Sequence, residues 1–103
     1  MLTVNIHIGA FVSVNRVCNV SHDCRIGDFS TIAPATNLSG GVELGAGCEI
    51  GSGVTTVEGV TVGEWTIVGA GAVVAASLPA NCTAVGVPAR PIKHRESGWQ
   101  LEA

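Results

Sequence analysis

The residue pair with the clearest chemical potential is His22-Asp23, which lies in the stretch NVSHDCRIGDF from Asn19 to Phe29. An imidazole titrates close to neutral pH, so it can take a proton from an amine or a hydroxyl group. A carboxylate beside it can orient or polarise the ring. The alternative is that His22 is a solvated residue at a turn, as most lone surface histidines are. The same surface interpretation is preferred for His7 and His94, which have no comparable neighbours.

A repeat of six residues organises the chain around this pair. Eleven of the twelve residues at this spacing are branched aliphatic, and only Thr56 departs from the pattern. The series is Ile8, Val14, Val20, Ile26, Ile32, Leu38, Leu44, Ile50, Thr56, Val62, Val68 and Val74. Small residues usually follow these positions, and a second inward position recurs four residues after each of them.

A period of six fits neither an α-helix nor a long amphipathic strand. It fits short strands joined by tight bends, in which each coil of a parallel β-solenoid buries its face on the next. His22 comes two residues after the inward Val20. We therefore expect its side chain at an outer edge of the solenoid and not in the core.

The pattern of an aliphatic residue followed by a small one, repeated every six residues, resembles the hexapeptide-repeat family. The resemblance covers roughly residues 2–79 and implies an all-β fold, a left-handed parallel β-helix with 18 residues per coil and about four coils. The later stretch AVGVPARPIKHRE resembles the segment that closes such domains. We therefore predict a β-helix over residues 1–80 and a closing segment over residues 81–103, formed by a short tail or helix.

A coil of 18 residues places Gly40 next to His22 and Gly41 next to Asp23. Neighbouring strands are about 4.8 Å apart, so His22 and the Gly40 backbone are expected to lie close together at one edge. The Gly40 N–H can then donate to an oxyanion that develops on a thioester carbonyl. This arrangement suits acyl transfer.

A longer stretch, NRVCNVSHDCRIGDFSTIAPATNLSGGVELG, is similar to sugar acetyltransferases of the sialic-acid O-acetyltransferase and UDP-amino-sugar N-acetyltransferase type. The resemblance implies that His22 is the general base, that Asp23 supports it and that Gly40 contacts the acetyl carbonyl. Many members carry a second histidine nine residues after the first. Thr31 stands there in this chain and cannot act as a proton shuttle.

The resemblance implies acetyl-CoA as the acyl donor, and an amine or hydroxyl of a sugar or sugar nucleotide as the acceptor. It also implies a homotrimer with the site between subunits, and it assigns Arg90 and Lys93 to the phosphates of coenzyme A. Relatives commonly carry a sugar-nucleotide-binding domain ahead of the β-helix. Whether this chain is a fragment or stands alone stays open, as does O- versus N-acetylation. A non-catalytic oligomerisation or interaction module is the alternative function.

The cysteines Cys18, Cys24 and Cys48 occupy the second inward position, where a small buried side chain is needed. Their spacing does not match a CxxC metal clamp, so we interpret them as structural thiols; the role of Cys82 is open. A metal-dependent, carbonic-anhydrase-like β-helix needs three convergent histidines. His7 and His94 lie at opposite ends of the chain, so no metal is expected.

The net charge of −3 and only five Lys plus Arg argue against nucleic acid or an anionic membrane as the main partner. The start MLTVNIHIGAF has no basic segment followed by an apolar one, so we do not expect a secretory signal and predict a cytoplasmic protein. The segment Trp65–Ala89 carries no charge, but its Gly and Pro residues and its repeat argue against a membrane helix.

Overall fold

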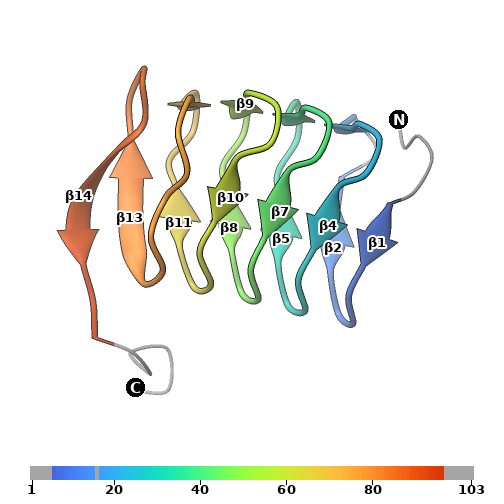
Figure 1. The fold of residues 1–103 in the computed structure, drawn as a ribbon, viewed down its shortest axis with the longest axis horizontal. Helices are drawn as coiled ribbons and strands as arrows, with labels where there is room; N and C mark the ends of the chain where they lie inside the picture. Colours follow the sequence, from blue (N-terminus) through green and yellow to red (C-terminus); the bar gives the residue numbers. More distant parts are fainter. Residues whose placement is uncertain (1–5, 16, 97–103) are drawn as a thin grey trace.

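A computed structural model describes residues 6–15 and 17–96 of the chain. They form a parallel β-solenoid of about four coils that advances from the N-terminus to the C-terminus (Figure 1). This is the all-β solenoid predicted from the six-residue repeat, and its architecture is consistent with a left-handed β-helix. The described residues contain strands and turns and no helix.

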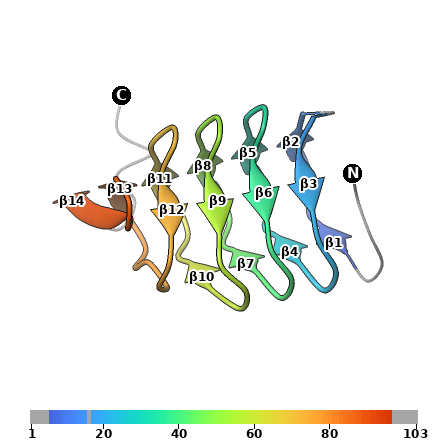
Figure 2. The same cartoon turned by 90° about the horizontal axis from the view of Figure 1, so that it is seen from above.

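Twelve strands of two residues each build the coils. They are β1 (His7–Ile8), β2 (Ser13–Val14), β3 (Asn19–Val20), β4 (Arg25–Ile26), β5 (Thr31–Ile32), β6 (Asn37–Leu38), β7 (Glu43–Leu44), β8 (Glu49–Ile50), β9 (Thr55–Thr56), β10 (Thr61–Val62), β11 (Ile67–Val68) and β12 (Val73–Val74). Strands of the same face in successive coils pair in parallel, for example Asn19 with Asn37. Three sheets result, and Figure 2 shows one of them, β3-β6-β9-β12, from outside.

The aliphatic series points into the solenoid and forms its core from β3 onward. Thr56 takes its place in this series and is only 2% exposed. The second inward position is filled by Cys, Ser, Thr, Ala and Val, with Leu78 as its last residue. Five of the Cys, Ser and Thr side chains donate a hydrogen bond to a carbonyl 15 residues later. The bonds run from Cys18 to Ala33, Cys24 to Ser39, Ser30 to Gly45, Thr36 to Gly51 and Cys48 to Gly63. We refer to these five side chains as the inward donors.

All four cysteines are buried, and none of them forms a disulfide within the described residues. For Cys18, Cys24 and Cys48 this agrees with the interpretation as structural thiols. Cys82 lies in β13 (Cys82–Val85), which continues one sheet alongside β11, and β14 (Arg90–His94) pairs antiparallel with β13. The expected tail or helix is therefore a β-hairpin in the described part of the closing segment. It covers the last coil and so keeps the hydrogen-bonding edge of β11 from being exposed.

Two-residue corners join the strands, and the second residue of a corner commonly has a positive φ. Glycine fills many of these positions, but Asp23, Phe29 and Trp65 also take this conformation, with φ of 59°, 63° and 55°. Because the corners repeat every coil, their side chains form ridges along the edges of the solenoid. One ridge carries the His22-Asp23 pair.

Candidate active site

The corner that joins β3 to β4 presents His22 and Asp23 to solvent. The side chains of both residues are 59% exposed. Val20 and Cys24, which flank the corner, are buried and fix the chain on both sides. The prediction that His22 lies at an outer edge is confirmed.

The His22 ring lies directly over Gly40 of the next coil. A β-carbon placed on Gly40 would be 2.5 Å from His22 Cε1 and 2.6 Å from His22 Nε2. Every side chain larger than hydrogen would therefore displace the ring. Gly40 is itself buried in this arrangement. The 18-residue coil thus brings together the two residues that the sequence predicted as neighbours.

Asp23 contacts the same ring, with Oδ2 3.1 Å from Nδ1 of His22. A carboxylate can only accept a hydrogen bond, so Nδ1 carries the proton in this contact and Nε2 keeps a free lone pair. Nε2 is also one of the ring atoms nearest Gly40. Sequence alone did not show which nitrogen Asp23 meets. Both side chains are well exposed, so the interaction between His22 and Asp23 contributes little energy and serves mainly to orient the ring.

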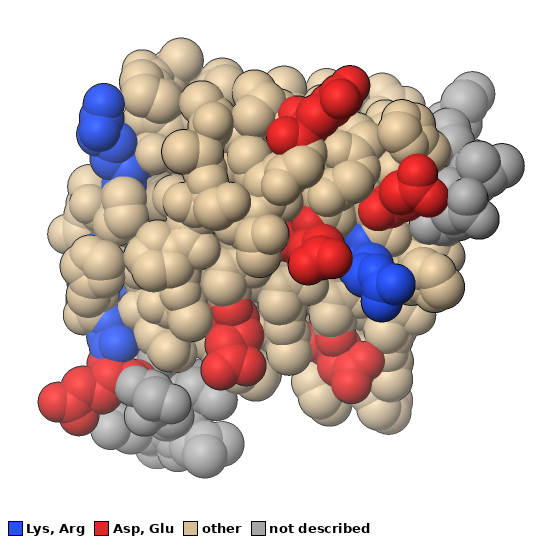
Figure 3. All heavy atoms as spheres, viewed as in Figure 1, with Lys and Arg blue, Asp and Glu red and all other residues tan. Residues whose placement is uncertain are grey.

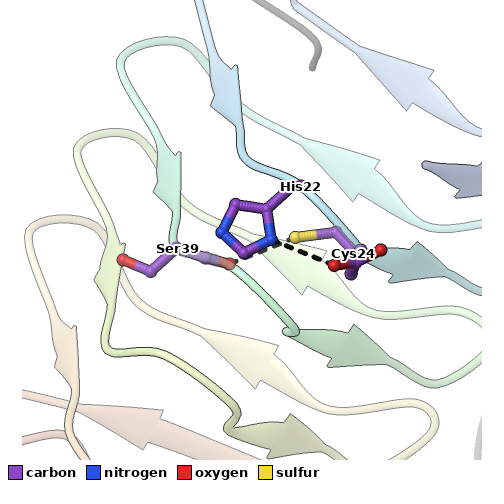
Figure 4. A network of polar contacts seen from close by, with 4 residues as sticks. His22, Cys24 and Ser39 are labelled. Atoms are coloured by element: carbon purple, nitrogen blue, oxygen red, sulfur yellow. Dashed lines mark hydrogen bonds and ion pairs between the residues drawn. The ribbon is translucent and has the colours of Figure 1, made fainter. Parts of the chain in front are cut away.

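The backbone around Gly40 leaves one N–H group available. Ser39 N–H donates to Thr56 Oγ1 at 3.0 Å, and Gly41 N–H donates to the His22 carbonyl at 3.0 Å. Between them, the Gly40 N–H donates none of the backbone hydrogen bonds found within residues 17–96. Figure 4 shows the His22 ring beside this segment, with Ser39 on one side of the ring and Cys24 on the other.

A corner amide of the same type meets an anionic oxygen elsewhere in the chain. Ala10 is the first residue of its corner, as Gly40 is of its own, and Ala10 N–H donates to Oδ1 of Asp28 at 2.8 Å. This contact shows that the corner geometry of the repeat allows such an N–H to bind a negatively charged oxygen.

Thr31 does not lie beside His22 in a single chain. It is the exposed first residue of β5, in the sheet β2-β5-β8-β11-β13-β14, whereas His22 lies at the corner between the other two sheets. Thr31 borders a hollow of about 390 Å³ that Glu49 and Ile67 also line. A second hollow, of about 570 Å³, lies over β1, β4, β7 and β10 and includes Arg25 and Glu43. Neither hollow includes His22.

Arg90 and Lys93 lie on β14, exposed, at the far end of the solenoid. The strand of their sheet that follows the His22 corner along the chain is β5. In the sheet, β14 is four strand positions from β5, which corresponds to roughly 19 Å at about 4.8 Å between neighbouring strands. The structure therefore does not bring these two side chains to His22. The nearby Arg95 packs the hairpin, since its guanidinium donates to Thr83 Oγ1 at 2.7 and 2.9 Å.

Charged side chains are scattered over the face that carries β4 and β7, with much uncharged surface between them (Figure 3). Residues 6–15 and 17–96 contain no group of three or more His, Cys, Asp or Glu side chains that could hold a metal ion. In the same ranges no helix has the length and apolar character needed to cross a membrane.

Solved structures similar to this chain are acetyltransferases. A variant of perosamine N-acetyltransferase from Caulobacter crescentus, in complex with CoA and GDP-perosamine, is 32% identical with a TM-score of 0.75 over 87% of this chain and 51% of its own. The acetyltransferase domain of PglB from Neisseria gonorrhoeae, with acetyl coenzyme A, is 33% identical with a TM-score of 0.77 over 88% and 47%. The structural relatives are hexapeptide-repeat acetyltransferases.

WeeI from Acinetobacter baumannii is also similar to this chain, with 41% identity and a TM-score of 0.84 over 88% of this chain and 45% of its own. The chain thus spans about half the length of these relatives. No protein-family model matches the chain. No curated protein sequence matches it either.

Proposed function

We propose that this chain is the acetyl-transfer domain of an acetyl-CoA-dependent sugar acetyltransferase. The observation that carries the proposal is the position of the His22 ring over Gly40, with Nε2 facing the corner whose N–H is available. A candidate base and a candidate oxyanion donor thus lie next to each other, the base exposed and the donor beneath its ring. The structural relatives crystallised with CoA or acetyl coenzyme A support the choice of donor.

In this mechanism, His22 Nε2 takes a proton from the amine or hydroxyl of the acceptor sugar as that atom attacks the thioester carbonyl. The Gly40 N–H donates to the oxygen of the tetrahedral intermediate. When the carbon–sulfur bond breaks, the imidazolium returns its proton to the departing thiolate of coenzyme A. Asp23 keeps the Nδ1 proton in place, so that Nε2 remains the basic atom.

The proposed assembly is a homotrimer. The edge that carries His22 is open, and Thr31 borders a hollow on a different face. A neighbouring copy that packs against this edge would bring the two regions together and exclude water from the reaction. Arg90 and Lys93 remain candidates for the phosphates of coenzyme A, and light scattering at micromolar concentration should give the mass of three chains.

The function is tested by thiol release from acetyl-CoA with a panel of amino sugars, neutral sugars and sugar nucleotides. General base catalysis typically contributes about 10²- to 10⁴-fold, so we expect His22→Ala to reduce the turnover by that factor. His94→Ala is the matched control, because His94 is exposed on β14 and remote from the edge. Equal rates for the parent and His22→Ala would reject the assignment of the base.

A further inference from the structure

Next to Gly40, one backbone hydrogen bond between coils is missing, and two hydrogen bonds that involve side-chain hydroxyls take its place. After β3 and after β9, the first corner-side N–H donates to a strand carbonyl of the next coil, from Ser21 to Leu38 at 2.9 Å and from Val57 to Val74 at 3.0 Å. At the equivalent position after β6, Ser39 N–H donates instead to Thr56 Oγ1 at 3.0 Å. Ser39 Oγ then donates to the Thr56 carbonyl at 2.6 Å.

This exchange explains the one polar residue in the aliphatic series. Thr56 is buried, and its hydroxyl accepts from the Ser39 backbone while its carbonyl accepts from the Ser39 side chain. A valine at position 56 would preserve the shape of the side chain but remove the acceptor. The strand pairing between β6 and β9 accordingly involves only Asn37 and Thr55.

The carbonyl of Ser39 is held from the other side by the inward donor Cys24. The Cys24 thiol donates to it at 3.1 Å and is completely buried (Figure 4). Burial raises the pKa of the Cys24 thiol, so the group stays protonated and able to donate at neutral pH.

The Ser39 carbonyl and the Gly40 N–H belong to one planar peptide group. The only cis peptide among the described residues is Val87-Pro88, so the group is trans and its N–H points opposite to its C=O. Because the carbonyl faces the buried thiol, the Gly40 N–H faces away from the core. A hydrogen bond to the carbonyl also polarises the N–H, which strengthens a bond that the N–H donates by about 10–30%.

We propose that Cys24 and Thr56 are positioning residues that fix the direction of the Gly40 N–H for oxyanion binding. This inference rests on the proposed acetyl-transfer function. The thiol holds the carbonyl end of the peptide group, and Thr56 holds the preceding N–H, so rotation of the group is opposed at both places. Neither side chain touches the substrate, because both are buried beneath the edge.

Cys48 provides the matched control for Cys24. It is an inward donor at the same position of the repeat, is equally buried and donates to the Gly63 carbonyl at 3.2 Å. The peptide group that Cys48 holds links Gly63 to Glu64, and its N–H does not lie under His22. Valine fills the same repeat position at Val42, Val54 and Val60, and threonine fills it at Thr36, where its hydroxyl donates to the Gly51 carbonyl.

The kinetic test compares Cys24→Val, Cys24→Thr and Cys48→Val with the parent. Loss of a whole oxyanion donor costs about 10²- to 10³-fold, and we expect its misorientation in Cys24→Val to lower kcat by about tenfold. The KM for acetyl-CoA should stay unchanged, Cys24→Thr should recover most of the rate, and Cys48→Val should keep the parental kcat. Equal kcat values for the two valine variants, with an active parent, would overturn the inference.

A second measurement does not depend on turnover. In amide-resolved NMR spectra, Cys24→Val and Thr56→Val should each shift the Gly40 amide resonance and speed its hydrogen exchange, whereas Cys48→Val should leave both unchanged. An unmoved Gly40 resonance in both variants would show that the peptide group is not held by these side chains. A parent that releases no thiol with any acceptor would instead reject the proposed function, and the catalytic role of this positioning with it.

Discussion

Two edges of the solenoid place an aromatic ring over a glycine of the neighbouring coil, and they differ in what the ring can do. At one edge the imidazole of His22 covers Gly40. At the other the indole of Trp65 covers Gly47, and Phe11 and Phe29 stack along the same ridge with ring centroids 5.4 Å apart. The second edge therefore presents hydrocarbon surface without a titratable ring.

One corner amide of each edge shows a further difference. At the aromatic edge, Asp28 fills the position in front of the Ala10 N–H. At the histidine edge, the carboxylate of Asp23 turns to the ring, and no side chain within residues 17–96 accepts from the Gly40 N–H. The repeat supplies the same backbone at both places, so the side chains decide whether a corner amide is closed or open to a ligand.

Among the substitutions that compare these two edges, Gly40→Ala should have the largest effect on turnover. The added β-carbon would lie 2.5 Å from His22 Cε1, and the exposed ring can yield only by turning away from its position. A displacement of about 1 Å can cost 10²-fold in rate, so acetyl transfer should fall by roughly that factor or more. The melting temperature should change little, since Gly40 does not have a positive φ. Full activity in Gly40→Ala would contradict a role for this contact.

Gly47→Ala should show the opposite behaviour. Gly47 has φ of +67°, a conformation that costs an L-residue about 1–2 kcal/mol, and the new methyl group would also meet the Trp65 ring. Urea denaturation should therefore show a loss of at least that size in the free energy of unfolding. Transfer activity at a temperature where the variant is folded should equal that of the parent. A large loss of turnover would show that the aromatic edge also contributes to the reaction.

The smallest effect is expected for Asp23→Asn. Because both partners of this hydrogen bond are 59% exposed, their interaction is worth at most about 1 kcal/mol, which corresponds to no more than about fivefold in rate. Asp28→Asn on the aromatic edge is the control and should leave kcat/KM unchanged. A loss of several orders of magnitude in Asp23→Asn would indicate that Asp23 acts directly on the acceptor.

The sequence predicted the coils and the contact between His22 and Gly40 well, because both follow from a fixed period. The β-hairpin of β13 and β14 was not predicted, since residues 82–94 carry no six-residue repeat. Arg90 and Lys93 could not be placed for the same reason. The roles of His22, Asp23 and Gly40 in catalysis stay predictions.

Thr56 shows the limit of the period more clearly. The sequence marked it as the one exception in the aliphatic series but gave no partner for its hydroxyl. Its partner is the backbone of Ser39, and a backbone group leaves no signal in the residue types. The meaning of the exception was therefore visible only once the neighbouring coil was in place.

The open amide at Gly40 also determines what a saturation mutagenesis experiment can detect. Every residue type except proline carries the same N–H, so no codon encodes the proposed oxyanion donor itself. The role of this N–H should appear instead in which substitutions preserve activity at nearby positions. Only glycine should be accepted at position 40, only hydroxyl or thiol side chains at 24, and only threonine or serine at 56. A profile of accepted substitutions would thus outline a functional group that contributes no side chain.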